Sequence, residues 1–199
     1  MVVLLILSVV MIAGGLYMIF FRDISPPKHG QTPLASVKNA IMYPPGNLYG
    51  YTKGNSLLAT VQNYASADGR CNLRFGTLSS NDLPGKNNDE IIANLMKGLV
   101  EQTGAPVKGP TPGSELRIRN ANPENDFDYY TMPTVFYSVT GATFKAKIYY
   151  SVAILQSGER AIVSRSCQHA DGSEVTDTEI QLTNDLAKKI SASSFDQNE

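Results

Sequence analysis

Cys167 and His169 are the two side chains in this sequence whose types and spacing come closest to supporting chemistry. They lie two residues apart, so on one strand their side chains would share a face, as a thiolate nucleophile and its general base must. With Asp171 they could also offer three ligands to a metal ion, although zinc usually takes four. Cys167, however, is in phase with the apolar residues Ala161 and Val163, which favours a buried structural cysteine. We therefore predict no enzyme, no metal site and no cofactor.

Cys71 is the other cysteine, and both cysteines fall on the apolar phase of predicted strands. In an oxidising compartment, a bridge between Cys71 and Cys167 would close a long loop and add roughly 4–5 kcal/mol of stability in the chain-entropy model. Two separate buried thiols would explain the same positions, because cysteine packs as a small hydrophobe. Both alternatives remain open, and Cys71 and Cys167 form the candidate disulfide.

A set of tyrosines provides a second candidate site. Tyr129, Tyr130 and Tyr149 lie in or beside predicted strands. In the Tyr149-Tyr150 pair, successive side chains point to opposite faces of a strand, so one ring faces away from the core. Exposed tyrosine gives contact area at low entropic cost, which is typical of protein interfaces. We predict Tyr129, Tyr130 and Tyr149 as a partner surface, with aromatic packing as the alternative.

The composition excludes several functional classes. The 199-residue chain has 17 basic and 18 acidic residues and a formal net charge of −1. This balance does not provide the basic surface that nucleic acid requires, and a hydrophobic content of 42% argues against general disorder. Two cysteines are too few for a disulfide-rich scaffold. We expect no nucleic-acid partner, and we infer no small-molecule substrate.

The first part of the chain predicts a membrane anchor. Residues 2–21 carry no charged side chain, and a helix of this length spans about 30 Å, the thickness of a bilayer's hydrocarbon core. Tyr17, Phe20, Phe21 and Arg22 provide the aromatic and basic groups typical of a membrane interface. A cleaved signal peptide is the alternative, but its apolar region is shorter, follows a basic segment and ends in small residues. We predict an uncleaved transmembrane anchor over residues 1–22, in contact with membrane lipid.

Two opposed patterns bear on the orientation of this anchor. Arg22, Lys28 and Lys38 follow the apolar segment, and the positive-inside rule therefore favours a cytoplasmic C-terminus. The low lysine content of the remaining chain, its Asn-, Ser-, Thr- and Tyr-rich composition and the cysteine pair favour the opposite orientation. We adopt the second orientation: a single-pass protein of the cell inner membrane whose C-terminal domain faces the periplasm, on the non-cytoplasmic side.

The elements that follow the anchor indicate an α+β domain. We predict a proline-rich spacer over residues 23–48, a globular domain over 49–195 and a tail over 196–199. Alternating apolar residues predict strands over 56–65 and 70–78 and a meander between 115 and 168. Helical spacing predicts helices over 89–103 and from Thr176, where Thr176 and Glu179 match a capping box. The order β-β-α-β-β-β-β-α favours an antiparallel sheet packed by two helices on one face.

This order of elements is similar to that of the PsbP/DcrB-like α+β fold family. The similarity covers residues 50–195 and comprises the early hairpin, the helix from Asp89 to Thr103, the strand meander and a terminal helix ending at Ser194-Phe195. Members of that family are typically non-enzymatic accessory, assembly or binding modules, so the resemblance implies a helper role. It transfers no site residues, because none matches residue by residue.

The anchor, the spacer and the incomplete catalytic set lead to one expected function. We predict a non-catalytic, membrane-anchored accessory or structural subunit of a membrane-associated protein complex, with other membrane proteins as partners. The alternative is a membrane-tethered binding or immunity protein that captures a soluble ligand or toxin.

Overall fold

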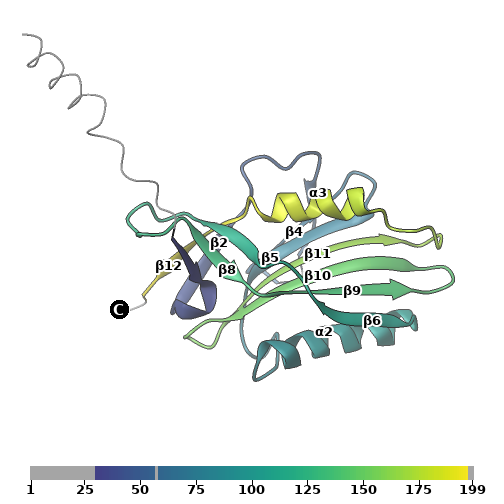
Figure 1. Ribbon diagram of the computed structural model, residues 1–199, viewed down its shortest axis with the longest axis horizontal. Helices are drawn as coiled ribbons and strands as arrows, with labels where there is room; N and C mark the ends of the chain where they lie inside the picture. Colours follow the sequence, from purple (N-terminus) through teal and green to yellow (C-terminus); the bar gives the residue numbers. More distant parts are fainter. Residues whose placement is uncertain (1–29, 57, 197–199) are drawn as a thin grey trace, which may run out of the picture. The chain divides into compact units, whose positions relative to one another are not determined.

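Two β-sheets and two α-helices build the described part of the chain, residues 30–56 and 58–196 of a computed structural model (Figure 1). The larger sheet has seven strands in the order β3-β4-β5-β11-β10-β9-β6, and the smaller has five in the order β1-β8-β7-β12-β2. The prediction of an α+β domain, with one antiparallel sheet and both helices on one face, is therefore wrong, because the described chain is mostly β and forms two sheets. Strands predominate, and the two helices lie on opposite sides of the seven-stranded sheet (Figure 1).

The elements have the following bounds. The seven-stranded sheet contains β3 (Thr52–Lys53), β4 (Val61–Ala65), β5 (Cys71–Leu78), β6 (Val107–Pro112), β9 (Thr134–Thr140), β10 (Lys145–Ile154) and β11 (Arg160–His169). The five-stranded sheet contains β1 (Gln31–Pro33), β2 (Asn39–Tyr43), β7 (Leu116–Asn120), β8 (Tyr129–Met132) and β12 (Ser191–Phe195). The helices are α2 (Asn88–Thr103), α3 (Asp177–Ala187) and a 3₁₀ turn, η1 (Leu34–Ser36).

Strand register explains why one layer of helices could not cover the seven-stranded sheet. Residues paired directly across antiparallel strands point to the same face. Cys167 of β11 pairs with Cys71 of β5 on one side and with Lys147 of β10 on the other. The apolar residues of β5 and of β10, such as Leu73 and Ile148, therefore lie on opposite faces. Each of the two apolar faces needs its own cover.

Helix α2 covers one of these faces, and α3 together with the five-stranded sheet covers the other. Under α2, Ile91, Ile92 and Met96 pack with Val152 and Ile162 of the sheet. The second core lies between the two sheets and under α3. Its fully buried members include Leu34, Leu73, Phe75, Ile118, Tyr130, Met132, Val163, Cys167 and Ile190.

The C-terminal helix begins as predicted but ends early. Thr176 caps α3 and forms a capping box with Glu179, which confirms that prediction. The helix ends at Ala187, and the Ser194-Phe195 pair, expected at the end of the terminal helix, lies in β12 instead. From Ser191 onward the backbone forms hydrogen bonds with β2 and β7 instead of helical ones, because β12 lies between these two strands in the five-stranded sheet.

Residues 31–43, which we expected within the proline-rich spacer, contribute β1, η1 and β2 to the five-stranded sheet. The prolines bound these elements rather than interrupt them: Pro33 ends β1, and Pro44 and Pro45 follow β2. Because proline donates no backbone hydrogen bond, strand ends and sheet edges are the positions it tolerates. Apolar Leu34 and Met42 are buried in the core between the sheets.

The predicted anchor over residues 1–22, including Tyr17, Phe20, Phe21 and Arg22, lies outside the described residues. Among residues 30–56 and 58–196, neither helix has the length and apolar character needed to cross a bilayer.

Candidate functional site

The structure brings Cys71 and Cys167 together beneath α3. They pair directly across β5 and β11 with their Cα atoms 4.0 Å apart and their sulfur atoms at disulfide distance. Cys167 is fully buried, and its Sγ lies 3.5 Å from Thr183 Oγ1 of α3. The proximity of the two cysteines is confirmed. A Cys167 sulfur bonded to Cys71 provides no thiolate for nucleophilic attack or metal binding.

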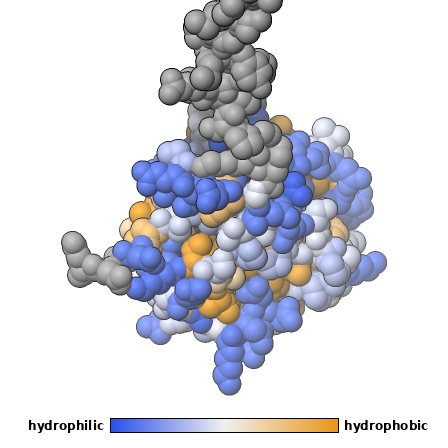
Figure 2. All heavy atoms as spheres, turned by 60° about the vertical axis from the view of Figure 1, so that its left-hand side comes forward, coloured by the Kyte–Doolittle hydropathy of each residue, from blue (hydrophilic) through white to orange (hydrophobic). Residues whose placement is uncertain are grey.

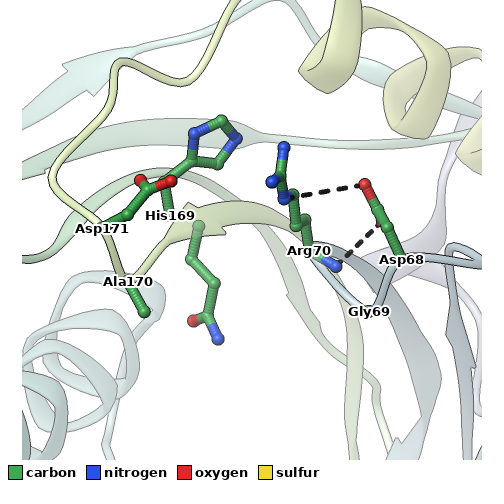
Figure 3. A pocket seen from close by; sticks show the side chains of 7 residues that line it. Asp68, Gly69, Arg70, His169, Ala170 and Asp171 are labelled. Atoms are coloured by element: carbon green, nitrogen blue, oxygen red, sulfur yellow. Dashed lines mark hydrogen bonds and ion pairs between the residues drawn. The ribbon is translucent and has the colours of Figure 1, made fainter.

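A pocket of about 410 Å³ opens beside this cysteine pair, at the ends of β5 and β11 (Figure 3). Asp68, Gly69 and Arg70 of the β4–β5 turn form one side, and residues 168–171 form the other. Arg70 Nε lies 3.8 Å from Asp68 Oδ2, and the Arg70 backbone N–H donates to Asp68 Oδ1. The Arg70 guanidinium is therefore already paired with Asp68 of the same turn, as the dashed lines in Figure 3 show.

His169 is the most deeply buried titratable side chain of this pocket, with 6% of it exposed. Its Nε2 lies 3.0 Å from Glu179 Oε1, and its Nδ1 lies 2.5 Å from Ser173 Oγ. The Ser173 hydroxyl donates to Asp171 Oδ1 over 2.6 Å. Because this single hydroxyl proton points to Asp171, it is not directed to His169 as nucleophilic catalysis would require. The serine–histidine–glutamate chain is arranged as a structural network.

This network attaches the N-terminus of α3 to the seven-stranded sheet. Glu179 Oε2 accepts hydrogen bonds from the backbone N–H and the hydroxyl of Thr176, while Glu179 Oε1 faces His169 of β11. Two lysines of β10 add ion pairs near the same helix end, Lys145 with Glu174 and Lys147 with Asp177. We call His169, Asp171, Ser173, Thr176 and Glu179 the α3 latch.

Acid is expected to weaken the α3 latch. The hydrogen bond from Ser173 lowers the pKa of the Asp171 carboxyl, and the hydrogen bonds from Thr176 lower the pKa of Glu179. A carboxyl with a lowered folded-state pKa contributes stability that is complete above its unfolded value of about 4 and is lost as the pH falls through the folded value. Urea unfolding followed by circular dichroism should therefore give a flat free energy from pH 7 to about 5 and a decline below about 4.

Glu179→Gln tests the latch directly. We expect it to lower the free energy of unfolding at pH 7 by about 0.5–1 kcal/mol, because glutamine keeps an acceptor for Thr176 but removes the negative charge at the N-terminus of α3, and to flatten the acid decline. The matched control is Glu101→Gln on α2, where an exposed pair with Lys97 is worth less than about 0.5 kcal/mol. A Glu179→Gln variant as acid-sensitive as the wild type would contradict the latch.

The three tyrosines predicted as a partner surface occupy different environments. Tyr130 is fully buried, and its hydroxyl donates to Ser194 Oγ. Tyr149 is half-buried and packs against Phe136, with the Arg165 guanidinium carbon 5.5 Å from its ring centre. Tyr129 is 41% exposed on the outward side of the five-stranded sheet. Of the three, Tyr129 presents the most accessible ring to a partner.

Arg165 explains the position of Tyr149. Arg165 is buried, its Nη2 donates to Ser151 Oγ over 2.6 Å, and Thr134 Oγ1 lies 3.4 Å from the same nitrogen. Burial lowers the pKa of its guanidinium to about 10, which leaves it charged at neutral pH. Its contacts are two hydroxyls and an aromatic ring, so we interpret Arg165 as a structural cation that orients Tyr149.

Exposed aromatic, apolar and cationic side chains gather on the outward side of the five-stranded sheet. Register places Tyr129, Arg119, Ser191 and Tyr43 in one row across four strands, because each pairs directly with the next. Tyr43 is 40% exposed and the adjacent Ile41 46%. We call this surface the outer face. Its side chains are Ile41, Tyr43, Arg117, Arg119, Tyr129, Ser191 and Ser193.

The charge of the outer face is entirely positive. None of its five strands contains Asp or Glu. Arg117 and Arg119 are exposed, and neither forms an ion pair with any residue that the structure describes. Figure 2 turns this end of the molecule forward and shows apolar side chains set among hydrophilic ones.

Sequence reasoning did not identify Ile41, Tyr43, Arg117 or Arg119 as site residues. The alternation of the two arginines with Leu116 and Ile118 indicated a strand with one polar face. It contained no information that this face adjoins Tyr43, because the neighbours of β7 come from distant segments of the chain.

No group of three or more His, Cys, Asp or Glu side chains within residues 30–56 and 58–196 is placed to hold a metal ion. Comparison of the chain with protein-family models and with curated proteins found no match.

Proposed function

We propose that this protein is a non-catalytic, membrane-anchored accessory subunit whose folded domain binds another protein of a membrane-associated complex through the outer face. The observation that carries the proposal is the row of Tyr129, Arg119, Ser191 and Tyr43, with exposed rings at its two ends and, between them, a cation that forms no ion pair with residues 30–56 or 58–196. Tyrosine and arginine dominate the binding energy of protein interfaces.

The charges of the outer face define the chemistry of the partner. Covering Arg117 and Arg119 removes water from two guanidinium groups, which is favourable only where the partner supplies acceptors for their hydrogen bonds. Carboxylates suit this role best, since they accept two parallel hydrogen bonds from one guanidinium. The partner surface should therefore combine acidic side chains with apolar groups that pack on Ile41 and Tyr43.

The N-terminal sequence and the cysteine pair support a tethered domain on the non-cytoplasmic side. Residues 2–21 have the length and composition of a bilayer span. Residues 22–30 separate that segment from β1 and reach about 30 Å when fully extended. Disulfides persist in oxidising compartments, so a bridge between Cys71 and Cys167 favours the periplasmic orientation.

Site-specific photo-crosslinking in intact membranes tests this function. A photoreactive residue at Tyr43 or Tyr129 of the full chain is expected to form a covalent adduct of one defined mass with an integral membrane protein. Leu182 on α3 and Val100 on α2 are the matched controls, because they are 49% and 41% exposed but lie outside the outer face. We expect no adduct at these two positions.

Charge reversal gives the second arm of the same experiment. Arg119→Glu should reduce the adducts at Tyr43 and Tyr129 at least about tenfold, because a charge pair across an interface is worth more than 1.4 kcal/mol. Lys53→Glu on the exposed strand β3 should leave them unchanged. Equal adducts at all four positions, or adducts with lipid alone, would contradict the proposal. An adduct with a soluble protein would support the tethered binding or immunity protein instead.

A further inference from the structure

The outer face of the five-stranded sheet is covered by neither α-helix of residues 30–56 and 58–196. Both helices pack on the seven-stranded sheet, α2 against β10 and α3 against β5 and β11. The outward side chains of β2 and β7 are large and exposed, whereas β12 between them presents Ser191 and Ser193 before Phe195 at its end. The outer face therefore has a low row of serines with a taller row on each side.

Strand register fixes the width of this low row. Ser191 pairs with Tyr43 on one side and with Arg119 on the other, so these two side chains flank β12 at the same level. Adjacent strands lie about 4.8 Å apart, which places the Cα atoms of Tyr43 and Arg119 about 9.6 Å apart. An α-helix is about 10 Å wide. One helix therefore fits along β12 between the two taller rows.

The face of a sheet also restricts the kind of segment that can rest on it. A segment placed there cannot pair with the sheet's backbone, and its own N–H and C=O groups cost free energy if they are buried without partners. A helix satisfies these groups internally, whereas a single extended segment does not. A second sheet would satisfy them too, but its flat face would rest on the taller rows and lose packing contacts over the serines.

Charged and apolar side chains lie on different sides of β12. The β7 row carries Arg117 and Arg119, which are about 7 Å apart along the strand. Helix residues four positions apart are separated by about 6 Å, so Asp or Glu at positions i and i+4 would reach one arginine each. The β2 row carries Ile41 and Tyr43, and a hydrogen bond between the Tyr43 hydroxyl and Ser193 Oγ holds that ring in place. A ring fixed before binding loses little entropy on binding.

We propose that the partner docks one amphipathic α-helix along β12, with acidic residues spaced by four toward β7 and apolar residues toward β2. This inference rests on the proposed function and gives the form of the partner segment that contacts the outer face. Ile41 and Arg117 lie on opposite sides of the level shared by Tyr43 and Arg119. The contact therefore extends over about 14 Å of strand, which corresponds to about nine residues of helix.

Mapping photo-crosslinks onto the partner tests the helix. A photoreactive residue is placed at Ile41, Tyr43 or Ser191 of the full chain in intact membranes, and the adducts are digested and sequenced by mass spectrometry. We expect adducts within one partner segment of about ten residues, at positions spaced by three, four or seven. Adducts at every second residue, or spread over several segments, would overturn the helix but leave the proposed function intact. No adduct at any position would contradict both.

Filling the low row tests where the helix lies. Ser191→Trp places a large ring between the two taller rows and should reduce the Ile41 adduct at least about tenfold, because it clashes with a helix seated there. Ser166→Trp is the matched control, since Ser166 is half-buried on β11 and lies outside the outer face. An unchanged melting temperature shows that Ser191→Trp folds. Equal Ile41 adducts in the two variants would overturn the proposal.

Charge exchange tests the acidic pair. Arg117→Glu should weaken the Ile41 adduct, and replacing the facing acidic residue of the mapped partner segment by arginine should restore it. Arg74→Glu is the matched control, because Arg74 is an exposed arginine on β5 of the other sheet. It should leave the adduct unchanged. A mapped segment without acidic residues, or no recovery on charge exchange, would overturn the proposal, whereas the wild-type adducts at Tyr43 and Tyr129 would still support the proposed function.

Discussion

Replacing both Cys71 and Cys167 by alanine should lower the free energy of unfolding by about 4–5 kcal/mol and the melting temperature by roughly 10–15 °C. The two residues are separated by 96 positions, and a cross-link that closes so long a loop removes much of the conformational entropy of the unfolded chain. Alanine is used because serine would place a hydroxyl in a site where Cys167 is fully buried. Urea unfolding and calorimetry measure both quantities.

Reductant provides the control for this prediction. Dithiothreitol should lower the stability of the wild type toward that of the double variant and leave the double variant unchanged. Because α3 covers the pair, with Thr183 against Cys167, reduction should proceed much faster in partly denaturing urea than in buffer. Two outcomes together would show that the bridge does not form. The wild-type protein as isolated would titrate with two free thiols, and its free energy of unfolding would be the same with and without reductant.

Gly76→Ala is expected to destabilise the protein by about 3 kcal/mol. Gly76 lies inside β5 with φ of 157°, and a Cβ added there would lie 2.1 Å from Thr60 O and 2.9 Å from Val61 Cα. Thr60 immediately precedes β4, and Val61 is the first residue of that strand. Since β5 is also paired with β11 on its other side, through Ile162, the strand cannot move away without losing hydrogen bonds. Equilibrium unfolding in urea measures the effect.

Gly98→Ala is the matched control. Gly98 lies in the middle of α2, and nothing lies within 4 Å of an added Cβ. Alanine should stabilise the helix here by up to about 1 kcal/mol, because glycine has the lower helix propensity. The two substitutions add the same methyl group and should change stability in opposite directions. If Gly76→Ala cost less than about 1 kcal/mol, β4 and β5 would not be packed as described.

Features decided by neighbouring residues in the chain were predictable from the sequence. The helix around residues 88–103 follows from its apolar spacing and ends at Gly104, which adopts a left-handed conformation. The start of α3 follows from the Thr176 and Glu179 capping box. The strands β5 and β10 follow from alternation over eight and ten residues. In each case the hydrogen bonds or the periodicity that define the element lie within a few residues.

Features decided by which strands pair became visible only in the tertiary structure. Alternation shows that a strand has two faces, but it does not show which face of one strand continues that of the next. Cys167 pairs with Cys71 of β5 and with Lys147 of β10, so the apolar sides of β5 and β10 lie on opposite faces of the seven-stranded sheet. One of these faces is covered by the second sheet together with α3. Residues 31–43 and 191–195 supply strands of that sheet, although each segment alone is too short or too proline-rich to indicate one.

The outer face arises for the same reason. Tyr43, Arg119, Tyr129 and Ser191 come from four separate segments, and they form one row because β8, β7, β12 and β2 are adjacent in the sheet. Residue type alone marked the tyrosines as candidates, and burial then separated Tyr129 from Tyr130. The sequence by itself therefore determined the local elements and which side of each is polar or apolar. Long-range backbone pairing, which depends on residues far apart in the chain, determined which of these sides lie next to one another and which face solvent.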